Sequence, residues 1–481
     1  MSTADAVTSA LRVDAAVASL IDRLGETAIL RGADAEPYTR DWRGLYKGRP
    51  ACVARPSSVD EVALTVAVCA SHRVSIVPHG GNTGLVGGAV PDGSGEQVVL
   101  SLARLNRIRD LDPVDLCVTL EAGVTLQAAR DAADRADCTL PLSIASQGSA
   151  QIGGIVSTNA GGNHTLRYGN ACDLVLGLEV VLADGRIWSG LRRLRKDNTG
   201  YRLREIFLGA EGTLGIVTAA CLRLVPRVRT TEVAFVAVPT VEAALTLLTR
   251  LRTADGETLH AFEYICGGGL ELVLSTVERT SRPLDVRADH YVLIELASSR
   301  TNAPLREVLE SVLAQGLEDG LINDAVLAST VAQQAALWKL REEQSEAQNR
   351  AGASIKNDIS VPISRTPEFM HRATNACLQI LPGVRVLPFG HLGDGNIHFN
   401  LVAAANAVGN TILEHGDALA AAVNEVARAL GGSFSAEHGI GQLKTGMLAE
   451  WRNGVELDIM RKLKEALDPE GLLNPGKVLA R

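Results

Sequence analysis

The sequence predicts an α+β protein of two or three domains, on the basis of three observations. Its 481 residues are too many for a single hydrophobic core. Glycine-rich loops border short apolar, strand-like runs throughout the first half. In the middle, strand-like and helix-like segments alternate as two tandem β-α-β units, which is typical of an antiparallel, ferredoxin-like sheet with helices on one face.

Hydrophobic periodicity places the individual elements. Strands are expected at 74–77, 174–181, 233–238, 259–265, 291–296, 325–328 and, more irregularly, 353–358. Helices are expected at 59–71, 241–251, 305–317, 331–350 and around 455–467.

Composition limits the class of function. The net charge of −8 argues against a nucleic-acid partner, and no apolar run approaches the roughly 18 residues of a membrane span. Eight scattered cysteines without a C-x-x-C pair predict reduced thiols. The N-terminus carries Asp5 and Asp14 and shows no apolar core before a cleavage site. We therefore expect a cytoplasmic enzyme.

Three loops of small residues suggest a phosphate-containing ligand. The first, 78–88, follows a strand and reads PHGGNTGLVGG. Backbone N–H groups in such a loop can bind an anion, although a lone glycine-rich loop is also common as a structural turn. Two further loops, 146–162 and 209–217, are similarly small and glycine-spaced. Together the three loops could wrap one long ligand of the size of FAD.

The segment 388–400, PFGHLGDGNIHFN, predicts a hairpin with a turn at 393–396. In this register His391 lies opposite His398, and Asn400 shares their face. A third metal-ligand candidate, Glu437, stands beside His438 in the loop SAEHG. Two histidines and a glutamate form a zinc-type set with open positions. On spacing alone, a hairpin with two hydrogen-bonded histidines and no metal is the alternative.

Longer motifs carry a family resemblance over residues from about 50 to the C-terminus. In order, PHGGNTG, IGGIVSTNAGG, KDNTGY and GAEGTLGIV resemble the FAD-binding half of the vanillyl-alcohol oxidase-type flavoproteins. GHLGDGNIHFN, SAEHGIG and LDPEGLLNPGK narrow the resemblance to the D-2-hydroxy acid dehydrogenase branch. Within that branch, the chain most resembles the members that act on 2-hydroxyglutarate.

The resemblance implies a two-part FAD-binding domain at 1–228 and a substrate-capping domain with the metal-binding hairpin at 229–430. A helical segment at 431–481 would pack back on the FAD domain and complete the active site. The implied FAD-binding residues are Pro78, Gly80, Gly81, Asn82, Thr83, Gly84, Leu85, Ser146, Gly148, Ser149, Gly153, Gly154, Thr158, Asn159, Ala160, Gly161, Glu211, Gly212, Gly215, Ile216, Val217 and Asn474. Asn82 occupies the place where many relatives of the wider fold carry a flavin-linking histidine, so we expect non-covalent FAD.

The branch holds a divalent metal, usually zinc, with residues matching His391, His398 and Glu437. The sequence does not distinguish zinc from manganese or cobalt. The implied chemistry is loss of the α-hydrogen as hydride to flavin N5, which converts a D-2-hydroxy acid to a 2-oxo acid. His438 would accept the hydroxyl proton or, alternatively, only orient Glu437, and Asn400 would orient the near carboxylate.

Specificity is expected from cations that face a second carboxylate. Arg341 and Ser345 share one face of the predicted helix with Trp338, and Lys356 follows. Alone, these are ordinary surface residues. The members that act on 2-hydroxyglutarate, however, hold its far carboxylate with Arg, Thr and Lys at positions matching Arg341, Ser345 and Lys356. Serine in place of threonine retains the hydroxyl.

The alternatives are a D-lactate, D-malate or glycolate dehydrogenase of the same family, or a metal-dependent binding protein without redox chemistry. The expected electron acceptor is an electron-transfer flavoprotein or a quinone. A homodimer is one candidate assembly.

Overall fold

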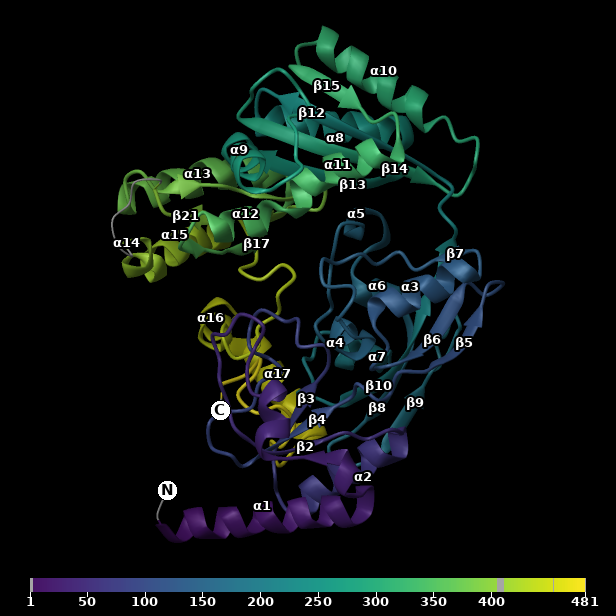
Figure 1. Ribbon diagram of the computed structural model, residues 1–481, viewed down its shortest axis with the longest axis vertical. Coiled ribbons are helices and arrows are strands. Elements are labelled where there is room, and N and C mark those ends of the chain that lie inside the picture. Colours follow the sequence, from purple (N-terminus) through teal and green to yellow (C-terminus); the bar gives the residue numbers. More distant parts are fainter. Residues whose placement is uncertain (1–2, 405–410, 453, 481) are drawn as a thin grey trace. The chain divides into compact units, whose positions relative to one another are not determined.

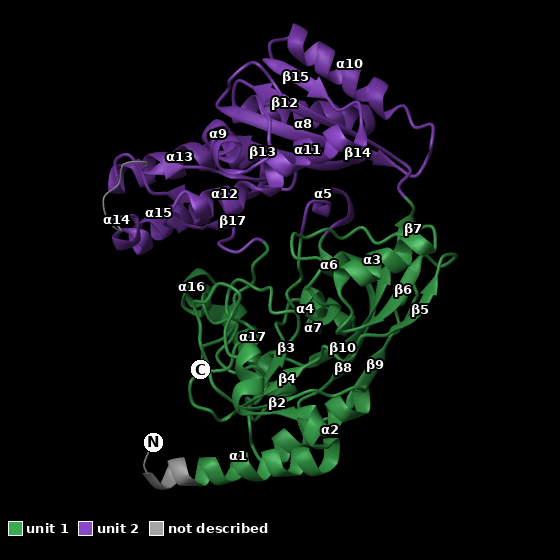
Figure 2. Cartoon of the chain, in the orientation of Figure 1, with its two compact units in different colours: residues 1–161, 170–227, 437–481 green, residues 162–169, 228–436 purple. Residues whose placement is uncertain are grey.

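The computed structural model describes residues 3–404, 411–452 and 454–480, and the chain divides into two compact units (Figure 2). Unit 1 comprises 1–161, 170–227 and 437–481, and unit 2 comprises 162–169 and 228–436. Residues 162–169 and 431–436, which we had expected in the flanking domains, therefore group with unit 2. Residues 437–481, at the C-terminal end, group with unit 1.

Unit 1 contains a four-stranded sheet in the order β1 (Ile29–Leu30), β2 (Pro50–Ala54), β4 (Gln97–Ser101) and β3 (Ile76–His79) (Figure 1). β2, β4 and β3 are parallel, and β1 is antiparallel to β2. Helix α2 (Val59–Ser71) begins at Ser58, whose side chain accepts a hydrogen bond from Glu61 N. Leu473, near the C-terminus, forms a parallel bridge with Ile76 at the β3 edge.

The second sheet of unit 1 is antiparallel, in the order β5 (Ile108–Asp112), β6 (Cys117–Glu121), β10 (Ile216–Arg223), β8 (Val175–Val181) and β9 (Ile187–Gly190). One buried cluster joins α1 (Thr3–Leu24), α2 and the first sheet to Val181 and Ile216 of the second. Burial of this shared apolar surface holds the two sheets together. The remaining elements of unit 1 are η1 (Glu26–Ala28), η2 (Gly32–Tyr38), α3 (Leu126–Arg135), β7 (Cys138–Thr139), α4 (Ile152–Ser157), α6 (Ala171–Leu174), α7 (Arg204–Phe207), β11 (Val225–Pro226), α16 (Thr445–Trp451) and α17 (Gly454–Leu467).

Unit 2 is built on a seven-stranded antiparallel sheet. Its order is β15 (Asp324–Leu327), β12 (Thr230–Val238), β14 (His290–Ser298), β13 (Leu259–Cys266), β19 (Phe389–His391), β20 (Asn396–His398) and β17 (Asp358–Ser360). The first four strands have the ferredoxin-like order that the two β-α-β units predicted. The sequence did not predict that the histidine hairpin, β19–β20, continues this same sheet.

Helices α8 (Val241–Asp255) and α10 (Leu305–Glu318) pack together and onto β12. A second group, α9 (Gly267–Thr276), α11 (Val331–Glu342) and α12 (Gln344–Arg350), packs among itself and contacts β12, β13 and β14. The rest of unit 2 consists of α5 (Thr165–Tyr168), β16 (Ser354–Ile355), η3 (Ile363–Arg365), α13 (Thr366–Ile380), β18 (Arg385–Val386), β21 (Leu401–Val402), α14 (Thr411–Glu414) and α15 (Gly416–Ala429), with β16, β21 and β18 forming a small sheet.

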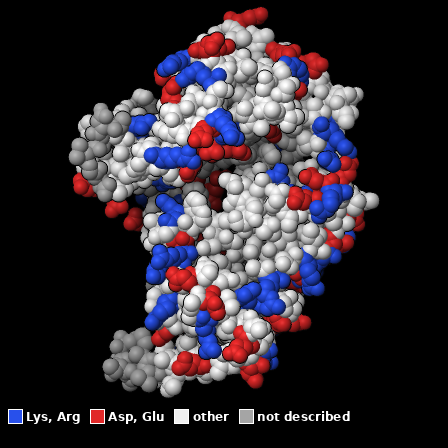
Figure 3. Space-filling model, viewed as in Figure 1, with Lys and Arg blue, Asp and Glu red and all other residues white. Residues whose placement is uncertain are grey.

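Two expected elements are interrupted. The helix predicted at 331–350 breaks at Glu343, which separates α11 from α12, and the strand predicted at 353–358 is split into β16 and β17. Acidic and basic side chains are interspersed over the face shown in Figure 3. Within the part of the chain that the structure describes, no helix has the length and apolarity needed to cross a membrane.

Candidate active site

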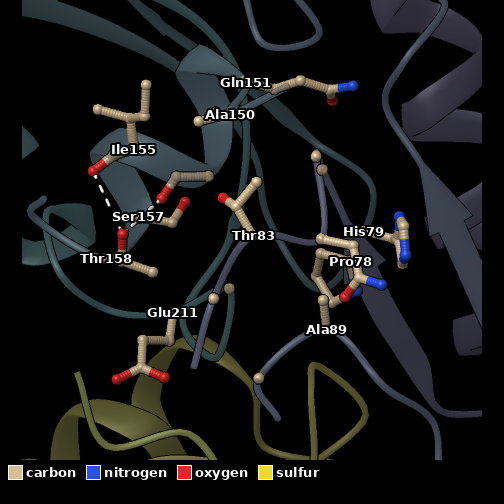
Figure 4. A pocket seen from close by; sticks show the side chains of 18 of the residues that line it. Pro78, His79, Thr83, Ala89, Ala150, Gln151, Ile155, Ser157, Thr158 and Glu211 are labelled. Atoms are coloured by element: carbon tan, nitrogen blue, oxygen red, sulfur yellow. Dashed lines mark hydrogen bonds between the residues drawn. The ribbon is translucent and has the colours of Figure 1, made fainter. Parts of the chain in front are cut away.

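The three glycine-rich loops of unit 1 converge on one cavity (Figure 4). The first loop follows β3, the second leads into and through α4, and the third precedes β10. Of the sequence-predicted FAD-binding residues, these line the cavity: Pro78, Gly80, Gly81, Asn82, Thr83, Gly84, Gly153, Gly154, Thr158, Ala160, Glu211, Gly212, Gly215, Ile216, Val217 and Asn474. Leu85, Ser146, Gly148, Ser149, Asn159 and Gly161 are not among the lining residues.

The loops pack so closely that side chains are excluded at their contacts. A Cβ atom on Gly81 would lie 2.0 Å from Ser149 O, and one on Gly153 would lie 2.7 Å from the Ala122 side chain. Gly212 has φ +71, and a Cβ there would lie 2.8 Å from the Pro78 ring. The glycines are therefore needed for loop-to-loop packing as well as for approach to a ligand.

Glu211 and Asn474 join the C-terminal segment to the cavity. The Glu211 carboxylate accepts hydrogen bonds from Ile440 N and Gly441 N, each at 2.7 Å. Figure 4 shows this side chain turned toward the C-terminal segment. Burial raises the pKa of Glu211, although these two hydrogen bonds oppose the rise. Asn474 Nδ2 donates to Gly88 O and to Glu211 O, at 3.0 and 2.8 Å.

Buried polar atoms without partners indicate that the cavity is built for a polar ligand. Both ring nitrogens of His79, Gln151 Oε1 and Asn474 Oδ1 are buried without a hydrogen-bond partner among the residues that the structure describes, and all three residues line the cavity. Such atoms are costly unless a bound molecule satisfies them. A flavin dinucleotide, with its ring and phosphate heteroatoms, fits this requirement. The sequence had placed Asn474 in the site but had missed His79 and Gln151.

In unit 2, the hairpin exists but its register differs from the one expected. His391 pairs with Asn396, and His398 pairs with Phe389, so the two histidines are not directly opposite. The loop closes earlier because Asp394 N and Gly395 N both donate to His391 O. His398 lies two residues after Asn396 and therefore shares a face with His391, and their ring centroids are 5.7 Å apart.

A carboxylate lies beside each of these histidines. His391 Nδ1 is 2.8 Å from Glu263 Oε1, and His398 Nδ1 is 3.8 Å from Asp358 Oδ1. Asn396 Nδ2 donates to Asp358 Oδ1 at 3.1 Å and so orients that carboxylate. Carboxylates in these positions orient histidines that bind metals. The sequence analysis missed both, since Glu263 and Asp358 are in strands β13 and β17, which only the sheet order brings beside the hairpin.

The residues predicted to clamp a second carboxylate have different environments. Arg341 is buried, and its Nε donates to Glu263 Oε2 at 2.7 Å. Its guanidinium also lies 4.9 Å from the centre of the Phe389 ring. Burial alone would raise the pKa of Glu263, but His391 and Arg341 hold it well below its ordinary value. Ser345 and Lys356 are exposed, and the break at Glu343 places Ser345 in a different helix from Arg341.

Asn400 lies beyond β20, buried, and its Nδ2 donates to Gln348 Oε1 at 2.8 Å. Trp338 Nε1 donates to Glu295 Oε2 at 2.7 Å.

In unit 1, His438 lines the cavity described above. Glu437 precedes it, and a Cβ atom on Gly161 would lie 2.7 Å from Glu437 Oε1. Of the four residues expected around the metal, His391 and His398 thus belong to unit 2, and Glu437 and His438 to unit 1.

Two family models match the chain. Residues 50–190 match the FAD binding domain, and residues 227–478 match the C-terminal domain of the FAD linked oxidases. A mitochondrial D-2-hydroxyglutarate dehydrogenase of Arabidopsis thaliana is 36% identical over 462 residues, which cover 95% of this chain and 80% of the relative. The D-2-hydroxyglutarate dehydrogenase of Xanthomonas citri pv. viticola is 36% identical, covering 93% of both chains.

Among solved structures, p-cresol methylhydroxylase with bound substrate matches with a TM-score of 0.75 and 18% identity, covering 98% of this chain and 97% of the other. Alkyldihydroxyacetonephosphate synthase matches with a TM-score of 0.72 and 17% identity, covering 96% and 84%. At these identities the likeness shows the fold.

The names of the relatives also correct one expectation. We had expected a cytoplasmic enzyme, but the relatives from Arabidopsis thaliana, Bos taurus and Rattus norvegicus are each named as mitochondrial. The acidic residues Asp5 and Asp14 near the start of the chain were therefore a poor guide to location.

Proposed function

The chain belongs to the FAD-linked oxidases, as a D-2-hydroxy acid dehydrogenase of the vanillyl-alcohol oxidase fold, and we propose that its substrate is D-2-hydroxyglutarate. The product would be 2-oxoglutarate. The observation that carries this proposal concerns the buried Arg341. Its guanidinium and the His391 imidazole contact the two oxygens of the same carboxylate, that of Glu263. A guanidinium is thereby fixed beside a predicted metal-binding imidazole, where a substrate with two carboxylates needs a cation.

FAD would occupy the cavity of unit 1. Backbone N–H groups of the glycine-rich loops would bind its phosphates. The buried ring nitrogens of His79 and the side-chain oxygens of Gln151 and Asn474 would form hydrogen bonds with its polar groups. When bound, FAD accepts a hydride from the substrate carbon at N5. Asn82, in the place of a linking histidine, donates from Nδ2 to Arg40 O at 2.8 Å, and so we propose that the flavin is held without a covalent bond.

His391, His398 and Glu437 would hold a divalent metal, with zinc as the first candidate. The Glu263 carboxylate, 2.8 Å from His391 Nδ1, supports this assignment, because it would fix the ring orientation of that ligand. Chain connectivity supports the third ligand. Ala436 N donates to Asp358 O, Asp358 pairs with His398, and Glu437 is the next residue along the chain. When bound, the metal supplies a Lewis acid for the substrate hydroxyl oxygen.

His438 would accept the proton of the substrate hydroxyl. Its place in the lining of the flavin cavity supports this role over one restricted to orienting Glu437. Asn400 Nδ2 is already directed to Gln348 Oε1, so any contact of Asn400 with the near carboxylate would require an exchange of this hydrogen bond.

Arg341 would bind the far carboxylate through its terminal nitrogens. Only its Nε has a hydrogen-bond partner among residues 3–404, 411–452 and 454–480. Lys356 and Ser345 are exposed and would turn toward the substrate when it binds. An electron-transfer flavoprotein or a quinone would then reoxidise the flavin.

Anaerobic reduction of the bound flavin by a panel of D- and L-2-hydroxy acids tests the proposal. D-2-hydroxyglutarate should bleach the flavin absorbance fastest, and L-2-hydroxyglutarate should leave it unchanged. A preference for D-lactate, D-malate or glycolate would identify another member of the family. The absence of bound flavin would instead favour a binding protein without redox chemistry.

A further inference from the structure

A second group of metal-ligand side chains lies in unit 2, apart from the hairpin histidines. His164, His260 and Glu295 each present one ligand atom, and these atoms lie within 4.8 Å of one another. His164 comes from the segment 162–169, whereas His260 and Glu295 come from the adjacent strands β13 and β14. His260 and Glu295 are buried, and His164 is partly exposed.

The spacing of these atoms suits a shared metal better than hydrogen bonds. His164 Nε2 is 3.5 Å and His260 Nδ1 is 3.7 Å from Glu295 Oε1. Both distances exceed the usual 2.7–3.2 Å of an N–H···O hydrogen bond. Two ligand atoms on a tetrahedral zinc ion, with bonds of about 2.0–2.1 Å, are separated by about 3.3–3.4 Å. Small shifts of the side chains would therefore accommodate an ion.

The other polar atoms of two of these ligands are already fixed by neighbours. His260 Nε2 is 3.0 Å from Tyr168 Oη, which leaves Nδ1 directed at Glu295. Trp338 Nε1 donates to Glu295 Oε2, which leaves Oε1 on the side of the two imidazoles. Metal-binding histidines and carboxylates in proteins are held by this kind of outer hydrogen bond. The ligand atoms of His260 and Glu295 are thus oriented before any ion binds, and that of His164 lies within 4.8 Å of both.

Burial lowers the pKa of His260, and one cation, Arg167, lies close enough to lower it further, which favours the neutral imidazole that a metal requires. Arg167 Nη1 donates to Ala297 O at 3.2 Å, and its guanidinium lies over the Tyr168 ring at 5.3 Å. The ligand set, with two neutral imidazoles and one carboxylate, carries a single negative charge. This set suits a divalent transition metal such as Zn²⁺ or Co²⁺, with a further position open to water.

We propose that His164, His260 and Glu295 form a second divalent metal site, separate from the site of His391 and His398. The ion would fasten the segment 162–169 to strands β13 and β14. That segment already contacts the sheet through Tyr168 and Arg167, and a Cβ atom on Gly393 would lie 2.7 Å from the Leu166 side chain. The metal would strengthen this attachment within unit 2.

Metal counting on the full flavin-containing protein tests the proposal. Protein loaded with Zn²⁺ and freed of excess by gel filtration is analysed for zinc per chain. His164→Ala should bind one equivalent less than the unmodified protein, and His164→Cys, which supplies another zinc ligand, should restore it. His371→Ala, a change at an exposed histidine of α13, should lose none. A His164→Ala protein with the zinc content of the unmodified chain would overturn the proposal.

A second measurement separates this site from the hairpin site. In a His398→Ala background, added Co²⁺ should give the visible absorption of a four- or five-coordinate ion, and added Zn²⁺ should raise the melting temperature. Both effects should disappear on further change of His164 to Ala. If they persist in the double variant, the second site is refuted. The His398→Ala variant and the double variant both lack His398, so they differ only at His164. The comparison therefore reports on the second site, whether or not the hairpin histidines bind a metal in the unmodified protein.

Discussion

The carboxylate of Glu263 links His391 to Arg341, because one oxygen lies 2.8 Å from His391 Nδ1 and the other accepts from Arg341 Nε at 2.7 Å. All three side chains are buried. The predicted metal ligand and the predicted substrate cation are therefore positioned by one residue of strand β13.

This linkage predicts that substitution of Glu263 weakens metal binding, although Glu263 is not itself a proposed metal ligand. Glu263→Gln retains the shape of the side chain but weakens the hold on the His391 ring, so zinc affinity should fall about 10- to 100-fold. Competition with a chromophoric chelator gives the dissociation constant. Glu271→Gln, at a carboxylate paired with Arg282 on the surface, is the matched control and should leave the affinity unchanged. Equal affinity of Glu263→Gln and unmodified protein would contradict the role of Glu263.

Loss of the hairpin metal should affect catalysis more than folding. His391→Ala, His398→Ala or Glu437→Ala should each lower kcat by about a hundredfold or more, since each factor of ten corresponds to about 1.4 kcal/mol of barrier. The flavin content should stay unchanged, because none of the three residues lines the FAD cavity. His371→Ala is the control. Full turnover by chelator-treated enzyme that elemental analysis shows to be metal-free would exclude the assignment.

The flavin should be released intact by acid. Asn82 cannot form the histidyl link seen in the wider fold, and His79 is buried and packs edge-on against Tyr38. Precipitation with trichloroacetic acid should therefore leave all the yellow colour in the supernatant. Absorbance remaining in the washed pellet would show a covalent flavin.

His79 should make the protein less stable in mild acid. Burial lowers the pKa of His79 to about 4, from an ordinary value of 6.5. Between these values the unfolded chain binds a proton that the folded chain does not, so stability is complete above pH 6.5 and declines as the pH falls toward 4. The contribution is at most about 3 kcal/mol.

The measurement is the drop in melting temperature between pH 7 and pH 5. His79→Leu should show a smaller drop than the unmodified protein, since all other titrating groups are shared. His72→Leu, at a partly exposed histidine of the same unit, provides the comparison. An identical drop in His79→Leu and unmodified protein would show that His79 is not the source.

The sequence was informative where chemistry is local. Glycine spacing located the three loops that line the cavity, and the β-α-β pattern predicted the order of the first four strands of unit 2. It was less informative where distant segments meet. The carboxylates of Glu263 and Asp358 come to the hairpin only through strand order, and no local pattern marks them.

The sequence also failed to predict the hairpin register and one helix boundary, because both depend on local backbone geometry. The hairpin loop closes on His391 O, one residue before the expected closure, and a shift of this size changes every cross-strand pair. The single helix expected at 331–350 ends at Glu342 because Glu343, with φ −80 and ψ 2, leaves the helical geometry, although its N–H still donates to Lys339 O. Ser345 consequently lies in α12 and does not share a helix face with Arg341 in α11.

The most direct test of the account is the ratio of kcat/KM for D-2-hydroxyglutarate to that for D-lactate. A substrate without the far carboxylate leaves the terminal nitrogens of the Arg341 guanidinium without the carboxylate proposed to bind them, which predicts a ratio of roughly a thousand or more. Lys356→Ala should reduce this ratio by slowing only hydroxyglutarate turnover, whereas Lys339→Ala, at a lysine bound to Glu278 O, should not. Equal efficiency with the two substrates in the unmodified enzyme would contradict the proposed function.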